Sequence, residues 1–227
     1  MKQFEKFLDL VDRYKKHNHN SEVLHDLRVG CRRLSSLIDR STDLAYALKK
    51  LRKLSNEIRD IDVFKEEFYQ NLKNSQQGKL KRSGFLKDLN DKKRAKEIDF
   101  LYFLNGIDWV ELPYVKSENK KSVHEAYPIT VPSKKRKSIH DFRIRVKKLR
   151  YVLELSEQEN DKQIDYLEKM QEVSGKIHDL DVAKLLLKDF SKKSATKKIK
   201  KSVKRKRTDL YIKLLSLVDD YLTIKSA

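Results

Sequence analysis

The sequence predicts an all-α protein made of two pseudo-symmetric helical bundles, with a basic central groove between them. Apolar residues recur at spacings of three and four along most of the chain, the pattern of helices that bury one face. The 227 residues include only 5 Gly and 3 Pro, so long helices are favoured over many short strands. A pattern of His, Asp and basic residues also occurs twice in the same order, which indicates an internal repeat.

The first half of the chain is expected to form four helical segments. The apolar spacing predicts helices over residues 4–14, 24–38 and about 43–72, and a further helical segment over about 79–105 that breaks at Gly84. Asn20 or Ser21 is suited to cap the second helix, because either side chain can accept a hydrogen bond from a backbone N–H group.

A connector and three more helices make up the rest. Residues 106–137 contain all three prolines and form the predicted connector, in which Ile129-Thr130-Val131 favours a short extended piece. Helical spacing resumes over residues 139–153, 164–180 and 196–222. We expect a single domain over residues 1–227, with one half at about 1–105 and the other at about 138–225.

The charge balance indicates an acidic partner. The chain has 53 Lys and Arg against 34 Asp and Glu, a formal net charge of +19. Nucleic acid, an anionic membrane surface or a phosphate polymer would each suit it. The single cysteine, Cys31, excludes an intramolecular disulfide. Because the sequence has no signal-like start and no apolar run of about 18 residues or more, we expect a cytoplasmic protein without a membrane role.

The repeat is the most informative feature. The segment His25-Asp26-Leu27-Arg28-Val29-Gly30-Cys31-Arg32-Arg33-Leu34 returns 115 residues later as His140-Asp141-Phe142-Arg143-Ile144-Arg145-Val146-Lys147-Lys148-Leu149. A second block, Ile58-Arg59-Asp60-Ile61-Asp62-Val63, returns after 119 residues as Ile177-His178-Asp179-Leu180-Asp181-Val182. The difference of 4 residues is about one helical turn. We infer two copies of one helical unit.

Each first motif places its basic residues in a row. At ~100° per residue, His25, Arg28 and Arg32 lie within a stripe about 60° wide. His140, Arg143, Lys147 and Arg150 form a second stripe, about 80° wide, directly beside the apolar face of the same helix. Cations at that edge would line a groove. Arginine at the same register in both copies suits a ligand with several oxygens, because the guanidinium forks onto them.

The second block allows two interpretations. Its aspartates could pair with the motif arginines as ordinary helix-surface ion pairs. Alternatively they hold basic side chains extended toward a ligand, while Arg59 and His178 extend the cationic groove. Residues 192–207 are denser in lysine but less specific, and within them Lys197, Lys201 and Lys204 share a helical face. Arg82 belongs to the candidate counterpart in the first half.

The two motifs together resemble a known family. Duplicated His-Asp-x-Arg with paired cations, each followed by an Arg/His-Asp-x-Asp-Val block, is similar to the CHAD domain, the conserved histidine α-helical domain. The resemblance covers about residues 1–225 and implies a basic cavity between two helical bundles that binds polyphosphate without catalysis. The first motif departs from the pattern, with Ser35-Ser36 where the second has Arg150-Tyr151, and with Gly30 where it has Arg145. The polyphosphate-binding residues that the resemblance implies are His25, Arg28, Arg32, Arg33, Arg59, His140, Arg143, Lys147, Lys148, Arg150, Tyr151 and His178, to which the lysine-rich regions add Arg82, Lys197, Lys201 and Lys204.

Two alternatives belong to other functional classes. An RNA-binding protein would use the same cations on phosphates, but a single-stranded groove also interleaves aromatic residues, which are few in the stripes. A metal-dependent phosphohydrolase would use the His-Asp pairs as ligands. However, the arginine three residues after His25 and His140 would repel a metal ion. We therefore expect a binding protein, associated with polyphosphate granules, that has no catalytic residues, metal or cofactor.

Overall fold

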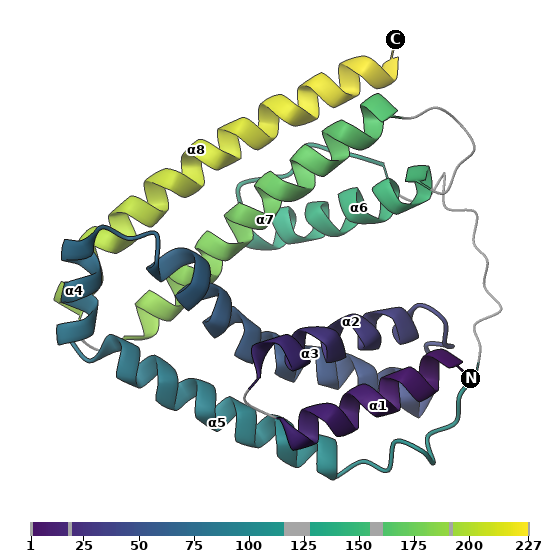
Figure 1. Cartoon of the computed structure of the whole chain (residues 1–227). Coiled ribbons are helices and arrows are strands. Elements are labelled where there is room, and N and C mark those ends of the chain that lie inside the picture. Colours follow the sequence, from purple (N-terminus) through teal and green to yellow (C-terminus); the bar gives the residue numbers. More distant parts are fainter. Residues whose placement is uncertain (1, 18–19, 116–127, 155–160, 191–192, 227) are drawn as a thin grey trace. The chain divides into compact units, whose positions relative to one another are not determined.

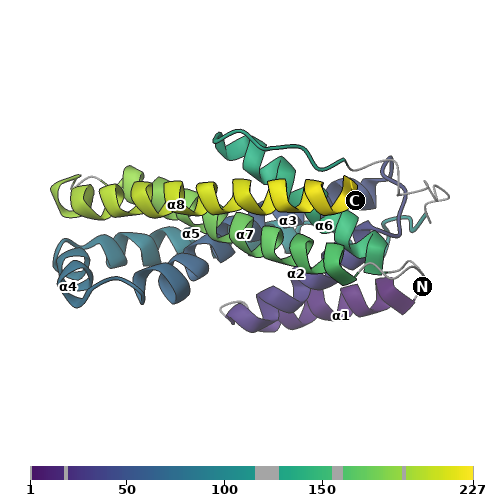
Figure 2. The same cartoon turned by 90° about the horizontal axis from the view of Figure 1, so that it is seen from above.

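The computed structural model describes residues 2–17, 20–115, 128–154, 161–190 and 193–226, and all regular structure in these ranges is helical, which confirms the all-α prediction. Figures 1 and 2 follow the helices by colour. By contacts the chain divides into unit 1 (Met1–Glu67 and Gly84–Lys120) and unit 2 (Phe68–Ser83 and Lys121–Ala227). In chain order the elements are α1 (Lys2–Lys16), α2 (Ser21–Ser35), α3 (Asp43–Val63), η1 (Phe64–Tyr69), α4 (Asn74–Arg82), α5 (Phe85–Asn105), α6 (Arg136–Glu154), α7 (Asp161–Asp189) and α8 (Lys193–Ser226).

Helix α2, which holds the first motif, has well-defined ends. Asn20 caps it as predicted: its side-chain oxygen accepts hydrogen bonds from the backbone N–H groups of Glu22 at 2.8 Å and Val23 at 3.2 Å. The helix ends at Ser35, earlier than the predicted residue 38. The hydroxyls of Ser35 and Ser36 each donate to a carbonyl of the last turn at 2.7 Å, and such local bonds compete with continuation of the helix.

The predicted third and fourth segments are each divided. Helix α3 ends at Val63, and the chain continues as the π-helical stretch η1 instead of one helix to residue 72. The break expected at Gly84 is present between α4 and α5, and α4 begins earlier than expected, at Asn74. Gly84 has a φ of 86°, in the left-handed region that side chains with a Cβ rarely adopt.

The described parts of the connector pack as irregular chain onto the two cores. In unit 1, Trp109 stacks edge-on against Phe7 with ring centroids 5.3 Å apart, and its Nε1 donates to the carbonyl of Leu104 at 3.0 Å. In unit 2, Ile129 is buried in the core, and Tyr211 donates its hydroxyl hydrogen to the carbonyl of Pro132 at 2.9 Å. The extended piece forms no strand within residues 128–135, and residues 116–127 of the connector lie outside the described residues.

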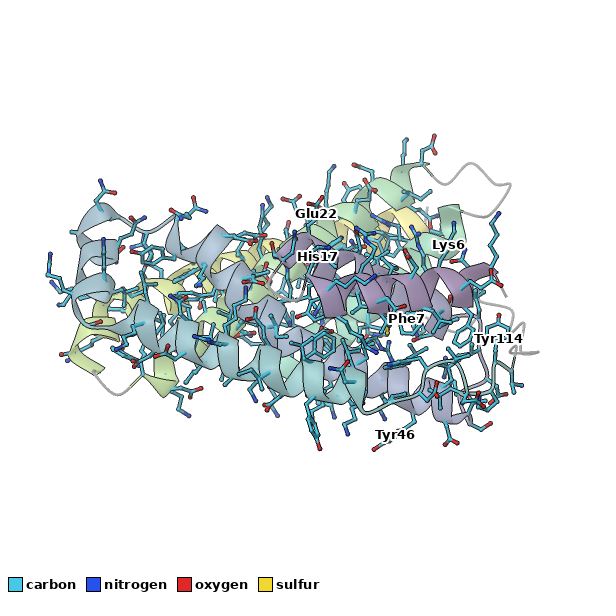
Figure 3. The ribbon with its side chains drawn as sticks, turned by 60° about the horizontal axis from the view of Figure 1, so that its bottom comes forward. Lys6, Phe7, His17, Glu22, Tyr46 and Tyr114 are labelled. Atoms are coloured by element: carbon cyan, nitrogen blue, oxygen red, sulfur yellow. The ribbon has the colours of Figure 1, made fainter. Side chains whose placement is uncertain are left out.

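The core of unit 1 lies among α1, α2, α3 and α5. Figure 3 shows Phe7 of this core and, at the edge of the unit, Tyr46, whose side chain is 70% exposed. Cys31 is buried in the same core, where its thiol donates to the carbonyl of Leu48 at 3.4 Å and burial raises its pKa to about 11. Helix α1 approaches α2 so closely that a Cβ on Gly30 would lie 2.6 Å from Leu10. Glycine at this position, where the second motif has arginine, therefore permits the packing of α1.

The core of unit 2 lies among α6, α7 and α8, with α7 in contact with both neighbours, and α4 packs against α8. Phe142 of the second motif is fully buried there, as are Met170 and Ile177 of α7. The first motif and the second block thus lie on α2 and α3 in unit 1, and on α6 and α7 in unit 2. The pseudo-symmetry of the two halves and their organisation as a single domain stay predictions.

Two glycine substitutions should shift stability in opposite directions. Gly84→Ala is expected to lower the free energy of unfolding by about 1 kcal/mol, because alanine is strained at positive φ even though nothing lies within 4 Å of the added Cβ. Gly78→Ala, inside α4, should raise it by about 0.5–1 kcal/mol, because alanine favours the helix and its Cβ would make an ordinary contact with Arg82. Urea denaturation measures both, and shifts of the same sign would contradict this account.

Candidate functional site

Arg28 lies at the centre of the basic cluster in unit 1. The charges of Arg32 on α2 and Arg59 on α3 act on its guanidinium, and so does the carboxylate of Asp60. Burial, together with the positive charge of Arg32, lowers the pKa of Arg28 to about 10, which still leaves it charged at neutral pH. Its Nη1 is buried and has no hydrogen-bond partner among the described residues. Residues of both unit 1 motifs therefore act on Arg28. Its charge is partly desolvated, and its Nη1 has no hydrogen-bond acceptor among the described residues.

The other predicted residues of unit 1 have different surroundings. Arg59 donates to the carboxylate of Glu66 at 2.9 Å, so part of its charge is already balanced within η1. Arg32 is exposed and shares the side of α2 that holds Arg28. His25 and Arg33 are exposed on the same helix.

In unit 2 the two motifs meet through their histidines. The rings of His140 on α6 and His178 on α7 have centroids 6.0 Å apart and are tilted by 34°. The Nδ1 of His178 lies 3.4 Å from the carboxylate of Asp179. Burial lowers the pKa of His140, and the nearby charges of His178, Arg143 and Arg136 act in the same direction, while Asp141 opposes them. These surroundings thus disfavour the charged form of the His140 imidazole.

Arg143, the counterpart of Arg28, lies across the neighbouring helix. A Cβ at Gly175 of α7 would be 3.7 Å from its Nε, so the guanidinium stem crosses α7 at a residue without a side chain. The Nε is buried and has no hydrogen-bond partner in the part of the chain that the structure describes. Both motif arginines therefore have a buried nitrogen without an acceptor.

The C-terminal end of the second stripe differs from its beginning. Arg150 is tied to α7 by an ion pair in which its Nη1 lies 3.1 Å from Glu168, so for this residue the ordinary ion-pair interpretation applies. Lys147 is half-buried and Lys148 is exposed. The side chain of Tyr151 lies outside the described residues.

The second aspartate of each second block has a structural role. Asp62 of α3 is buried and pairs with Lys93 of α5 at 2.6 Å, and Lys93 also contacts Glu97 at 3.4 Å. Asp181 of α7 is buried and pairs with Arg207 of α8 at 2.6 Å. Neither aspartate pairs with a motif arginine, so the expectation that they hold those arginines was wrong for both. The pairs instead join the second helix of each repeat to the last one.

Three of the remaining predicted residues lie on helices other than α6 and α7. Lys197 and Lys201 are exposed on α8, and Arg82 is exposed in the last turn of α4. Lys204, also on α8, lines a cavity in unit 2. Sequence reasoning missed Arg136, whose charge acts on His140. It precedes His140 by four residues, so the helical spacing that defined the stripe could have identified it.

A comparison with models of protein families matches the CHAD domain over residues 1–99 and 117–188. The chain belongs to the CHAD family. CHAD domains are known to bind polyphosphate, and the matched ranges include both copies of each motif. No curated protein matches the chain. Within its described ranges this CHAD protein has no group of three or more His, Cys, Asp or Glu side chains placed to hold a metal ion, and no helix long and apolar enough to span a bilayer.

The histidine pair of this CHAD protein can be tested by its titration. The pKa of His140 is expected below the ordinary value of about 6.5. It should rise in the variant His178→Gln, because a charged neighbour is removed while burial remains. NMR of the imidazole carbons measures this directly. Lys169→Gln, about 13 Å along α7 from His178, serves as the control and should leave the titration unchanged. A pKa of His140 at or above the ordinary value would contradict the described environment.

Proposed function

We propose that this protein binds inorganic polyphosphate along its two basic stripes, without catalysing a reaction. The observation that supports this most directly is the state of Arg28 and Arg143. These residues occupy the same motif position, and each has a buried guanidinium nitrogen with no acceptor among the described residues. A buried charged donor without a partner is costly, so an oxygen-rich anion that supplies the acceptor is bound favourably.

The stripes suit a phosphate chain better than a nucleic acid. A single-stranded nucleic acid is normally held by aromatic rings that stack on the bases as well as by cations. Phe142 of the second motif is fully buried in the core of unit 2 and is unavailable for stacking. The groups that this motif presents at its edge are instead the guanidinium of Arg143 and the imidazole of His140, both of which donate hydrogen bonds to phosphate oxygens.

A binding role without catalysis fits the surroundings of the histidines. A hydrolytic metal site needs several His and Asp ligands around one cation. Beside His140 the structure places His178 together with the positive side chains of Arg143 and Arg136. These charges favour an anion at the same place and oppose a divalent metal ion. Within the cell we expect the protein to associate with polyphosphate granules.

The triple variant Arg28→Ala, Arg143→Ala, Lys147→Ala tests the proposal. Loss of three cations that contact phosphate should weaken binding by about 100-fold or more. Calorimetric titration with polyphosphate of defined length measures the affinity, and circular dichroism checks that helical content is retained.

The matched control is Lys49→Ala, Lys87→Ala, Lys213→Ala, which removes the same charge from exposed positions outside the motifs. Its affinity should change by no more than a few-fold. Equal losses in the two triple variants would show general electrostatic attraction and not a site. RNA added at equal charge concentration should fail to displace polyphosphate; efficient displacement would favour the RNA-binding alternative.

Binding should depend on both pH and salt. Because the folded environment disfavours the charged form of His140, an anion that stabilises this form makes binding take up a proton. Affinity should therefore increase as the pH falls from about 8 to about 6, and this increase should be smaller in His140→Gln. Affinity should also fall steeply with salt through counterion release. Calorimetry at several pH values and salt concentrations measures both, and salt-independent binding would contradict an ionic site.

A further inference from the structure

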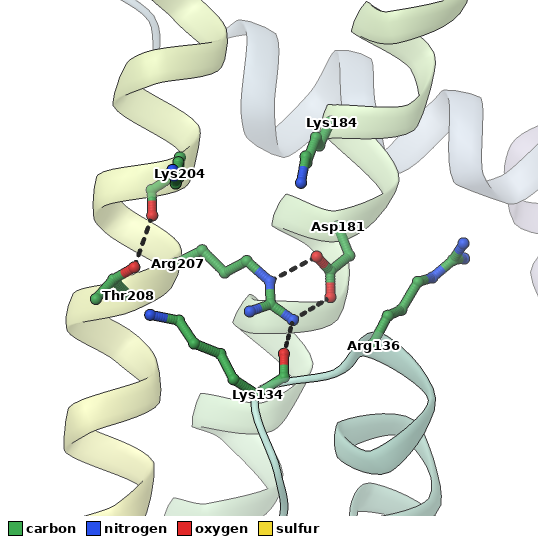
Figure 4. A pocket seen from close by; sticks show the side chains of 7 residues that line it. All are labelled: Lys134, Arg136, Asp181, Lys184, Lys204, Arg207 and Thr208. Atoms are coloured by element: carbon green, nitrogen blue, oxygen red, sulfur yellow. Dashed lines mark hydrogen bonds and ion pairs between the residues drawn. The ribbon is translucent and has the colours of Figure 1, made fainter.

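A positively charged cavity lies within unit 2, at the start of α6 and between α7 and α8 (Figure 4). Its volume is about 280 Å³. Five of its seven lining residues are cationic and one is anionic: Lys134, Arg136, Asp181, Lys184, Lys204, Arg207 and Thr208. Arg136 is also the residue one turn before His140, so the cavity adjoins the basic stripe of α6.

The single carboxylate of the cavity is already occupied. Asp181 accepts hydrogen bonds from Arg207 on both oxygens, from Nε at 2.6 Å and from Nη2 at 2.9 Å. Nη2 also donates to the backbone carbonyl of Lys134 at 3.0 Å. Arg207 is only 9% exposed and is held from two sides, so its guanidinium has a fixed orientation. Asp181 therefore positions a buried cation and does not compete for the other lysines and arginines.

One nitrogen of this guanidinium is still available. Nη1 of Arg207 has no hydrogen-bond partner within the described ranges, and Figure 4 shows it on the side of Lys134 and Thr208. The largely buried Arg207 thus keeps the two N–H groups of Nη1 for a ligand in the cavity that it lines. The hydroxyl of Thr208 donates to the carbonyl of Lys204 at 3.1 Å, so the donors left for a ligand come from the cationic side chains.

The lysines of the cavity come from three different segments. Lys184 of α7 and Lys204 of α8 are exposed, and no described carboxylate lies within ion-pair distance of either. The ammonium of Lys134 lies 5.8 Å from the centre of the Tyr211 ring, while its carbonyl fixes the backbone against Arg207. Cations converging from separate segments on one concave space suit an anion with several oxygens.

Size and charge restrict the class of this anion. Small-molecule sites span about 300–1,000 Å³, so the cavity corresponds to the smallest of them. A terminal phosphate has a charge of about −1.5 to −2 at neutral pH, more than a phosphate inside a chain. We propose that this pocket binds a terminal phosphate group, either of free pyrophosphate or at the end of a polyphosphate chain that continues along the α6 stripe. The second of these roles rests on the proposed function, and the first does not.

Calorimetric titration of the whole protein with pyrophosphate tests the pocket. The double variant Lys184→Gln, Lys204→Gln should weaken pyrophosphate binding by about tenfold or more. The control Lys188→Gln, Lys206→Gln removes the same charge from exposed lysines of the same two helices outside the cavity, and its affinity should change less than about twofold. Equal losses in the two double variants, or no binding of pyrophosphate to the unaltered protein, would overturn the proposal.

Linear and cyclic phosphates distinguish the two sources of the terminal group. Linear tripolyphosphate has ends, whereas trimetaphosphate is a ring without them. If chain ends enter the pocket, the pocket variant should lose affinity for tripolyphosphate and keep its affinity for trimetaphosphate. If the pocket variant loses affinity for pyrophosphate but not for tripolyphosphate, the pocket binds free pyrophosphate. An equal loss of affinity for trimetaphosphate would overturn the recognition of a terminal phosphate group.

The pocket and the proposed function can fail separately. Binding of long-chain polyphosphate without binding of pyrophosphate would refute the pocket and leave the proposed function intact. Binding of pyrophosphate that depends on Lys184 and Lys204, without binding of long chains, would refute the proposed function and leave a site for free pyrophosphate.

Discussion

The structure depends on placing rows of like charges along helices that must also bury an apolar face. Arg28 and Arg143 lie at that boundary, each beside core residues of its own helix. The boundary position desolvates part of each guanidinium, as the lowered pKa of Arg28 shows. Long basic side chains tolerate this because their stems pack on apolar surface while the charge stays near water. An anion that supplies the missing acceptors would therefore be favoured at these positions.

The buried ion pairs account for how the remaining helices are held. Asp62 with Lys93, and Asp181 with Arg207, each connect the helix of the second block to the last helix of the repeat. Removing one member of such a pair leaves a buried charge and destabilises a protein by about 3–5 kcal/mol, so both members are required together. The second block therefore combines two tasks. Its first polar position, Arg59 or His178, joins the basic cluster, and its second aspartate fixes the helix that presents it.

Much of the helical framework could be predicted from the sequence, because apolar spacing directly reflects burial. The cap at Asn20 and the break at Gly84 followed from local chemistry that these residues provide by themselves. The end of α2 at Ser35 and the π-helical stretch after Val63 did not, since they depend on hydroxyl hydrogen bonds and packing with no distinct sequence pattern. The partners of Asp62 and Asp181 also could not be predicted, because Lys93 and Arg207 are distant in the chain and resemble many other cations. The repeat indicated that His178 extends the basic stripe, but neither its ring contact with His140 nor the pairing of Arg150 with Glu168 could be predicted from it.

The burial of Cys31 has a practical consequence for spectroscopy. A thiol reacts as its thiolate, and with a pKa of about 11 only about one molecule in ten thousand has that form at neutral pH. The surrounding core also blocks the approach of reagents, since the side chain has no exposed surface. Cysteines engineered at the protein surface should therefore accept fluorescent or paramagnetic labels selectively, while the native one stays in place. Motions that accompany ligand uptake become measurable in a protein with an undisturbed interior.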